Sequence, residues 1–198
     1  MRPYQAVLIA ATGLIVAAIA AFVLYGGGGS GGRGVAAIGG PFTLTDQTGK
    51  TRTEQDLKGS YNLIYFGYTF CPDVCPTALQ VMTSAMDRLD KDTQQKIIPV
   101  FITIDPARDT VEQLRSYVEN FHPRMIGLTG TNEQIAQAAR AYRVYYAKSK
   151  DGGDTTEYLM DHSSIVFLMD PDGLYVTHFT HATEPDRMAE TLRQKIGG

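Results

Sequence analysis

Residues 62–76 read NLIYFGYTFCPDVCP, and this stretch decides the fold. Its first part, Asn62–Tyr68, is a mostly apolar and aromatic run, which is typical of a buried strand. After a turn of Cys and Pro residues, a helix is predicted from about Pro76 to Lys91. Four apolar residues recur there at helical spacing: Leu79, Met82, Met86 and Leu89. A buried strand followed directly by a helix is the beginning of a βαβ unit.

The alternation of strands and helices continues on both sides of this stretch. Downstream, we expect a strand at Ile97–Ile104 and then a helix at Thr110–Phe121, with a capping box of Thr110 and Gln113. A second helix at Asn132–Tyr142 is followed by a short strand at Val144–Ala147. Two further strands, Ser164–Met169 and Tyr175–Thr180, are joined by the turn Pro171–Gly173, and a helix at Glu184–Lys195 ends the pattern. Upstream, residues 42–44 and a stretch near Thr51 are expected to form a small hairpin around Asp46–Gly49. These elements indicate an α/β, thioredoxin-like fold with an added N-terminal hairpin.

The composition limits the kinds of protein this chain can be. It has 198 residues, 43% of them hydrophobic and 20% charged, which suits one globular core and is too short for several. Its net charge of −3 gives no basic surface for a phosphate backbone, so no nucleic-acid partner is expected. Two cysteines are too few for a disulfide scaffold, and both lie in the stretch quoted above. They are therefore expected to have a chemical role.

The N-terminal segment is long and apolar enough to cross a bilayer, because no charged residue lies between Arg2 and Arg33. We predict three parts of the chain: a transmembrane helix within residues 1–25, a Gly-rich tether at 26–40 and one folded domain at 41–198. A cleaved signal peptide is the alternative, since Ala18–Ala20 has the form of a cleavage site, but the apolar run continues beyond it. Too few residues precede the span for a mitochondrial presequence, so a bacterial inner membrane is expected.

The two cysteines can exist in two chemical states, a disulfide and a pair of thiolates. Cys71 and Cys75 are four positions apart, a spacing that a disulfide tolerates within a helical turn. As thiolates, they are a soft donor pair suited to Cu(I), and an added imidazole gives three ligands that Cu(II) also accepts. The helix predicted from Pro76 is expected to lower the pKa of the Cys75 thiol through the positive end of its dipole. The plainer alternative is two core cysteines, which would not need flanking prolines.

Three polar segments are expected to meet at one edge of the sheet, because the carboxyl ends of parallel strands gather there. They are Cys71–Pro76, Asp105–Asp109 and Asp161–His162, the last of which precedes a predicted strand. This placement makes His162 the natural third ligand. The other histidines are expected elsewhere: His122 in a surface loop, and His178 and His181 at the end of the last strand.

Four segments of the chain resemble the Sco/SenC family of copper-binding assembly factors for cytochrome c oxidase. Tyr65–Pro76 resembles the family's copper signature, Thr103–Thr110 its acidic loop, Tyr158–Ser163 its histidine segment and Phe42–Asp46 its opening. The resemblance covers residues 41–198 in family order. It implies a thioredoxin-like domain tethered in the bacterial periplasm, with Cys71, Cys75 and His162 as ligands of Cu(I) and Cu(II).

The resemblance implies a metallochaperone that receives copper from a donor protein or small molecule and passes it to the Cu(A)-bearing subunit of the oxidase. The alternative is a thiol-disulfide oxidoreductase that uses the redox pair Cys71 and Cys75 to reduce the cysteines of the Cu(A) site. It is thus open whether the protein is an enzyme. Asp105 and Asp109 have two readings: turn formation and helix capping before Thr110, or a role in partner docking or tuning. The role of Asp73 is equally undecided.

Overall fold

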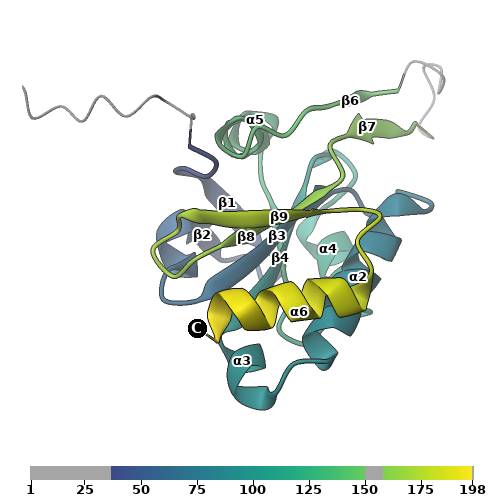
Figure 1. Ribbon diagram of the computed structural model, residues 1–198. Helices are drawn as coiled ribbons and strands as arrows, with labels where there is room; N and C mark the ends of the chain where they lie inside the picture. The colour runs from purple at the N-terminus through teal and green to yellow at the C-terminus, as the bar shows by residue number, and fades with distance from the viewer. Residues whose placement is uncertain (1–36, 150–157, 198) are drawn as a thin grey trace, which may run out of the picture. The chain divides into compact units, whose positions relative to one another are not determined.

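The computed structural model describes residues 37–149 and 158–197, which form a mixed sheet with helices around it (Figure 1). Within this part of the chain the main sheet has seven strands in the order β2-β1-β5-β4-β3-β8-β9. Their bounds are β1 Thr43–Asp46, β2 Thr51–Thr53, β3 Tyr61–Gly67, β4 Ile97–Thr103, β5 Ile126–Thr129, β8 Ile165–Met169 and β9 Tyr175–Thr180. Strands β3, β4 and β5 run parallel, and the remaining pairings are antiparallel. This topology confirms the predicted α/β, thioredoxin-like fold and its N-terminal hairpin.

The helices connect the strands and cover the sheet. They are the short 3₁₀ helix η2 Glu54–Leu57 and the α-helices α2 Val74–Asp87, α3 Lys91–Gln95, α4 Val111–Val118, α5 Asn132–Ala141 and α6 Pro185–Ile196. Helices α2 and α6 lie side by side, while α4 packs against β5 and α5 against β1. The core is built from the central strands: Leu63, Ile64, Tyr65, Phe66, Val100, Phe101 and Ile102 are almost fully buried. Such a core fixes the ends of β3 and β4 firmly.

The helix predicted from Pro76 to Lys91 corresponds to α2, which ends at Asp87, and a second helix, α3, begins at Lys91. Helix α2 begins earlier, at Val74, so that Pro76 lies in the first turn, where a missing N–H breaks no intrahelical hydrogen bond. Helix α3 starts separately because the Asp90 side chain accepts a hydrogen bond from the backbone N–H of Thr93. The earlier start of α2 places Cys75 inside the helix.

Strand β5 was not among the predicted strands, although it lies in the sheet between β4 and β1. It has four residues and contains Gly127, so its pattern is too short to stand out from a loop. The glycine is needed for packing, since an added Cβ would lie 2.9 Å from Val118 Cγ1 on α4. This strand completes the parallel unit β3-β4-β5.

The capping box predicted at Thr110 is half correct. The Thr110 hydroxyl accepts a hydrogen bond from the N–H of Gln113. The Gln113 side chain does not return to Thr110 but donates to the Thr69 hydroxyl, 3.1 Å away. Helix α4 is therefore tied to the segment that leads to Cys71.

The transmembrane helix predicted within residues 1–25 and most of the tether at 26–40 lie outside the described residues. Within residues 37–149 and 158–197, no helix combines the length and the apolar character that a membrane crossing requires.

Candidate metal centre

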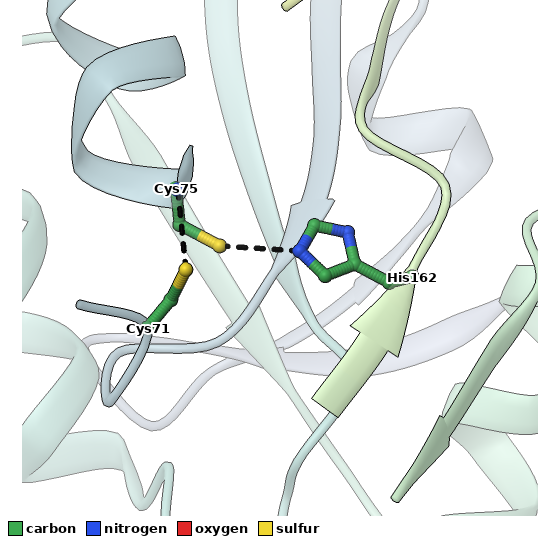
Figure 2. A group of neighbouring side chains, drawn as sticks. All are labelled: Cys71, Cys75 and His162. Carbon is green, nitrogen blue, oxygen red and sulfur yellow. Dashed lines mark hydrogen bonds between the residues drawn. The ribbon is translucent and has the colours of Figure 1, made fainter. Parts of the chain in front are cut away.

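The two cysteines lie where the chain leaves β3 and enters α2. Cys71 is in the turn before the helix, and Cys75 is in the first helical turn. The backbone N–H of Cys75 donates to Cys71 Sγ at 3.3 Å (Figure 2), because first-turn N–H groups have no acceptor within the helix. The sulfur of Cys71 is therefore held at the helix N-terminus. Both cysteines are free thiols in this structure.

His162 comes from a different part of the chain and faces the cysteines. It ends β7 (Met160–His162), which pairs antiparallel with β6 (Tyr146–Lys148) in a small second sheet. His162 Nε2 lies 3.4 Å from Cys75 Sγ, while Nδ1 lies 3.2 Å from the carbonyl oxygen of Ser163. A proton on Nδ1 that is donated to this carbonyl leaves the Nε2 lone pair free to bind a metal.

The three predicted site residues thus come together as one cluster. The two Sγ atoms and the nearest imidazole nitrogen all lie within 4.8 Å of one another. The convergence follows from topology, because β8 runs antiparallel to β3, and the segment before β8 therefore lies beside the end of β3. Strand β7 was predicted only as a lead-in to that strand, since three residues are too few for a recognisable pattern.

The cluster is open on one side. A cavity of about 370 Å³ is lined by Cys71 and His162, together with Tyr68, Asp73 and His181 among others. Cys71 is half-buried, whereas Cys75 is 0% exposed and does not line this cavity. A molecule that approaches through the cavity therefore meets Cys71 and His162 before it reaches Cys75.

The two thiols differ strongly in acidity. The hydrogen bond with the Cys75 thiol, together with hydrogen bonds from the backbone N–H groups of Asp73 and Cys75, holds the pKa of Cys71 well below its usual range. The same hydrogen bond to Cys71, together with burial, raises the pKa of Cys75. The expectation that the helix end lowers the pKa of Cys75 is therefore wrong. Because Cys71 precedes the helix, its sulfur, not that of Cys75, receives the N-terminal N–H groups.

Two tyrosines surround the cluster, and sequence reasoning did not single them out. The rings of Tyr65 and Tyr68 each meet the His162 ring edge-on, with centroids 6.0 Å apart. The buried Tyr65 hydroxyl lies 3.8 Å from Cys75 Sγ and 3.1 Å from the Ser164 hydroxyl. The Tyr68 hydroxyl accepts a hydrogen bond from the N–H of Met160. Their positions, six and three residues before Cys71 in the sequence, were the available signal.

The acidic loop lies beneath the site and is turned inward. Asp109 is 0% exposed and accepts hydrogen bonds from the Thr69 N–H, the Thr69 hydroxyl and the Thr103 hydroxyl. Asp105 is 3% exposed and pairs with Arg108. Their burial argues against partner docking for both residues, since neither carboxylate is accessible to a partner. Asp73 is different, because it is exposed and lines the cavity.

The other histidines do not belong to the three-residue cluster, although His181 lines the same cavity. His122 is 5% exposed, so the prediction of a surface loop residue is wrong; burial lowers its pKa, and its Nδ1 accepts from the N–H of Arg124. His178 is exposed on β9 and bonds the Tyr175 hydroxyl at 2.6 Å. His181 follows β9 and lines the cavity.

Comparisons with known proteins give one consistent family. A family model described as SCO1/SenC matches residues 30–197. A SCO2-like protein of Rickettsia conorii is 46% identical over 158 residues, which cover 80% of this chain and 77% of the relative. The mitochondrial SCO1 homolog 1 of Arabidopsis thaliana is 42% identical over 163 residues, covering 82% of this chain and 48% of the relative, so the chain spans about half that protein's length. The crystal structure of Arabidopsis thaliana ScoI with copper bound matches at a TM-score of 0.75 and 42% identity, over 81% of this chain and 99% of that chain.

Proposed function

The chain belongs to the SCO1/SenC family, and from this premise we propose that it is a copper metallochaperone for the Cu(A) site of cytochrome c oxidase. One observation carries the proposal: two thiol sulfurs and an imidazole nitrogen converge within 4.8 Å. Copper is the cargo of such a protein. The copper-bound Arabidopsis relative supports the choice of metal.

The donor set fits copper in both of its common oxidation states. Thiolates select soft metals such as Cu(I), and an imidazole nitrogen suits Cu(II) as well. Because hydrogen bonds lower the pKa of Cys71, whereas the hydrogen bond to Cys71 and burial raise that of Cys75, the Cys71 thiol loses its proton more readily than the Cys75 thiol when a metal binds. The Nδ1 contact with the Ser163 carbonyl fixes the tautomer that presents Nε2 to the cysteines.

Transfer proceeds through the open side of the cluster. A ligand from the partner enters the cavity and meets Cys71 and His162, which line it, while buried Cys75 holds the cargo longest. Exchange of one ligand at a time avoids a free copper ion. The proposed recipient is the Cu(A)-bearing subunit of the oxidase, and the proposed source is a donor protein or a small-molecule copper complex.

Membrane attachment is part of the proposal. The apolar segment within residues 1–25 would anchor the chain in the bacterial inner membrane, and the domain would lie in the periplasm, where the Cu(A) site is assembled. An alkaline phosphatase fusion after Gly34 is expected to be active. An inactive fusion, with an active cytoplasmic reporter at the same joint, would contradict this orientation.

A thiol-disulfide oxidoreductase is the second candidate, since both cysteines are free and Cys71 lines the cavity. The imidazole facing the sulfurs favours the chaperone, because dithiol exchange does not require a third metal ligand. The His162→Ala substitution separates the two functions, as it leaves both cysteines in place.

The deciding experiment measures the Cu(A) content of the oxidase in cells carrying His162→Ala, with disulfide reduction by the purified variant assayed in parallel. A chaperone predicts reduced Cu(A) content with normal thiol exchange. Full Cu(A) content with normal thiol exchange would overturn the chaperone and favour the oxidoreductase.

A further inference from the structure

A single arginine contacts both segments that supply the site. The Arg108 guanidinium carbon lies 3.6 Å from the centroid of the Tyr158 ring and 4.7 Å from that of the Phe70 ring. Phe70 directly precedes Cys71, and Tyr158 leads into β7, which carries His162. Cation–π contacts at these distances are attractive, and their strength increases when water is excluded.

Arg108 is itself held in one orientation. Its Nε donates to Asp105 Oδ2, and the Tyr158 hydroxyl donates to Asp105 Oδ1 at 2.7 Å. The three side chains therefore form a closed ring of contacts, in which the Arg108 side chain is 15% and the Asp105 side chain 4% exposed. A planar guanidinium that stacks and pairs at the same time cannot be replaced by lysine without loss. We call Asp105, Arg108 and Tyr158 the arginine clamp.

Strand β7 is held against the domain by the clamp and by the edge-on contacts of His162 with Tyr65 and Tyr68. It pairs over three residues with β6 and is not part of the seven-stranded sheet. The Met160 N–H also donates a hydrogen bond to the Tyr68 hydroxyl at 3.2 Å, which connects β7 to the segment before Cys71. A change at the clamp would therefore be transmitted to His162, four residues beyond Tyr158.

We propose that Arg108 is a positioning residue that holds the His162 segment at the distance from Cys71 and Cys75 at which all three bind copper. The proposal rests on the copper-binding function above and explains why the acidic loop is turned inward. Asp105 acts by fixing Arg108, and the clamp acts on the imidazole without touching the metal ligands.

Copper titration of the full chain carrying Arg108→Gln tests the proposal. Cu(II) affinity is expected to fall tenfold to a hundredfold, the range typical for residues that orient metal ligands. Cu(I) affinity is expected to change less than about threefold, because two thiolates suffice for this ion. Arg108→Lys, which keeps the charge but not the planar stack, should give an intermediate Cu(II) affinity.

Arg88→Gln is the matched control. Arg88 also pairs with a carboxylate, Asp186, at 2.7 Å, but this pair joins α2 to α6 at the surface. Arg88→Gln should therefore bind Cu(I) and Cu(II) with the affinities of the wild type. An Arg108→Gln chain with the Cu(II) affinity of the wild type would overturn the proposal, as would a parallel loss of Cu(I) affinity and thermal stability, which would indicate a merely structural role.

A second readout needs no copper and so remains valid if the proposed function fails. Amide hydrogen exchange is measured at Met160, whose N–H bonds Tyr68, and at Val166 in β8 of the main sheet. Arg108→Gln should speed exchange at Met160 and leave Val166 protected. Unchanged protection at Met160 in Arg108→Gln would overturn the positioning role of the clamp. Absence of copper binding by the wild-type chain would overturn the proposed function alone.

Discussion

Gly67 ends β3 at a point where no side chain fits. An added Cβ would lie 2.8 Å from Cys75 Sγ and 2.9 Å from Tyr65 Cε1. We predict that Gly67→Ala costs about 1–3 kcal/mol of unfolding free energy, the usual range for overpacking, and also weakens Cu(I) binding because Cys75 must move. Chemical unfolding and a Cu(I) competition titration check both effects.

Gly127→Ala is the control for this substitution. Its added Cβ would crowd Val118 Cγ1 at 2.9 Å, which is just as close but away from the cysteines. It should cost a similar unfolding free energy and leave Cu(I) affinity unchanged. Equal losses of Cu(I) affinity in the two variants would show that crowding at Cys75 is not the cause.

The unequal thiols predict an order of alkylation. Cys71 lines the cavity and has a lowered pKa, whereas Cys75 is buried and has a raised pKa. At neutral pH, iodoacetamide should therefore modify Cys71 at least tenfold faster, since an ordinary thiol is only a few per cent ionised at this pH. Mass spectrometry of the singly alkylated protein gives the order, and first modification at Cys75 would refute the assignment.

For single residues, the sequence was most informative about which residues form the site and least informative about the acidity and burial of their side chains. The convergence of Cys71, Cys75 and His162 could be predicted from their residue types, from the strand order and, for His162, mostly from the resemblance to the Sco/SenC family. The acidity of the two thiols could not, because it depends on which sulfur precedes the helix. The burial of His122 also could not, because a Phe-His-Pro segment has no periodicity that distinguishes a packed loop from an exposed one.

Among the elements, the β1–β2 hairpin is stabilised by one buried carboxylate. Burial alone would raise the pKa of Asp46, but hydrogen bonds from Thr48, Arg52 and Lys50 outweigh it and lower the pKa to about 2. Because the folded-state pKa is below that of the unfolded chain, the stabilisation is complete above about pH 4 and is lost as the pH falls toward 2. It amounts to about 2 kcal/mol.

Asp46→Asn tests this contribution. The variant should be less stable than the wild type at pH 6, and the difference should shrink between pH 4 and pH 2, as followed by urea unfolding at several pH values. Asp186→Asn is the control, because its carboxylate is 87% exposed and its pair with Arg88 should contribute little. A constant difference at every pH would contradict the role of the Asp46 charge.

Elements with a long pattern were predictable, whereas two short strands, β5 and β7, were not. The buried run of β3, the hairpin β8–β9 and the helices α5 and α6 agree with their predicted positions within a few residues. Strands β5 and β7 have four and three residues, and their pairing comes from tertiary contacts. The break between α2 and α3 depends on one cap, Asp90, within an otherwise continuous helical pattern.

For the whole molecule, the redox state of the cysteines should control copper loading. Oxidation with diamide would join Cys71 and Cys75 in a disulfide, with two electrons passing to the diamide, and a sulfur in a disulfide is no longer a thiolate ligand. We predict that the oxidised full chain retains less than a tenth of the copper bound by the reduced chain, measured after gel filtration. Full retention by the oxidised chain would contradict the assignment of both sulfurs.

The central claim is that Cys71, Cys75 and His162 together hold copper, and X-ray absorption at the copper edge of the loaded full chain tests it most directly. The spectrum should show two sulfur neighbours and one imidazole in the wild type, one sulfur fewer in Cys71→Ser and in Cys75→Ser, and no imidazole scattering in His162→Ala. A wild-type spectrum without sulfur neighbours, or imidazole scattering that persists in His162→Ala, would contradict the account.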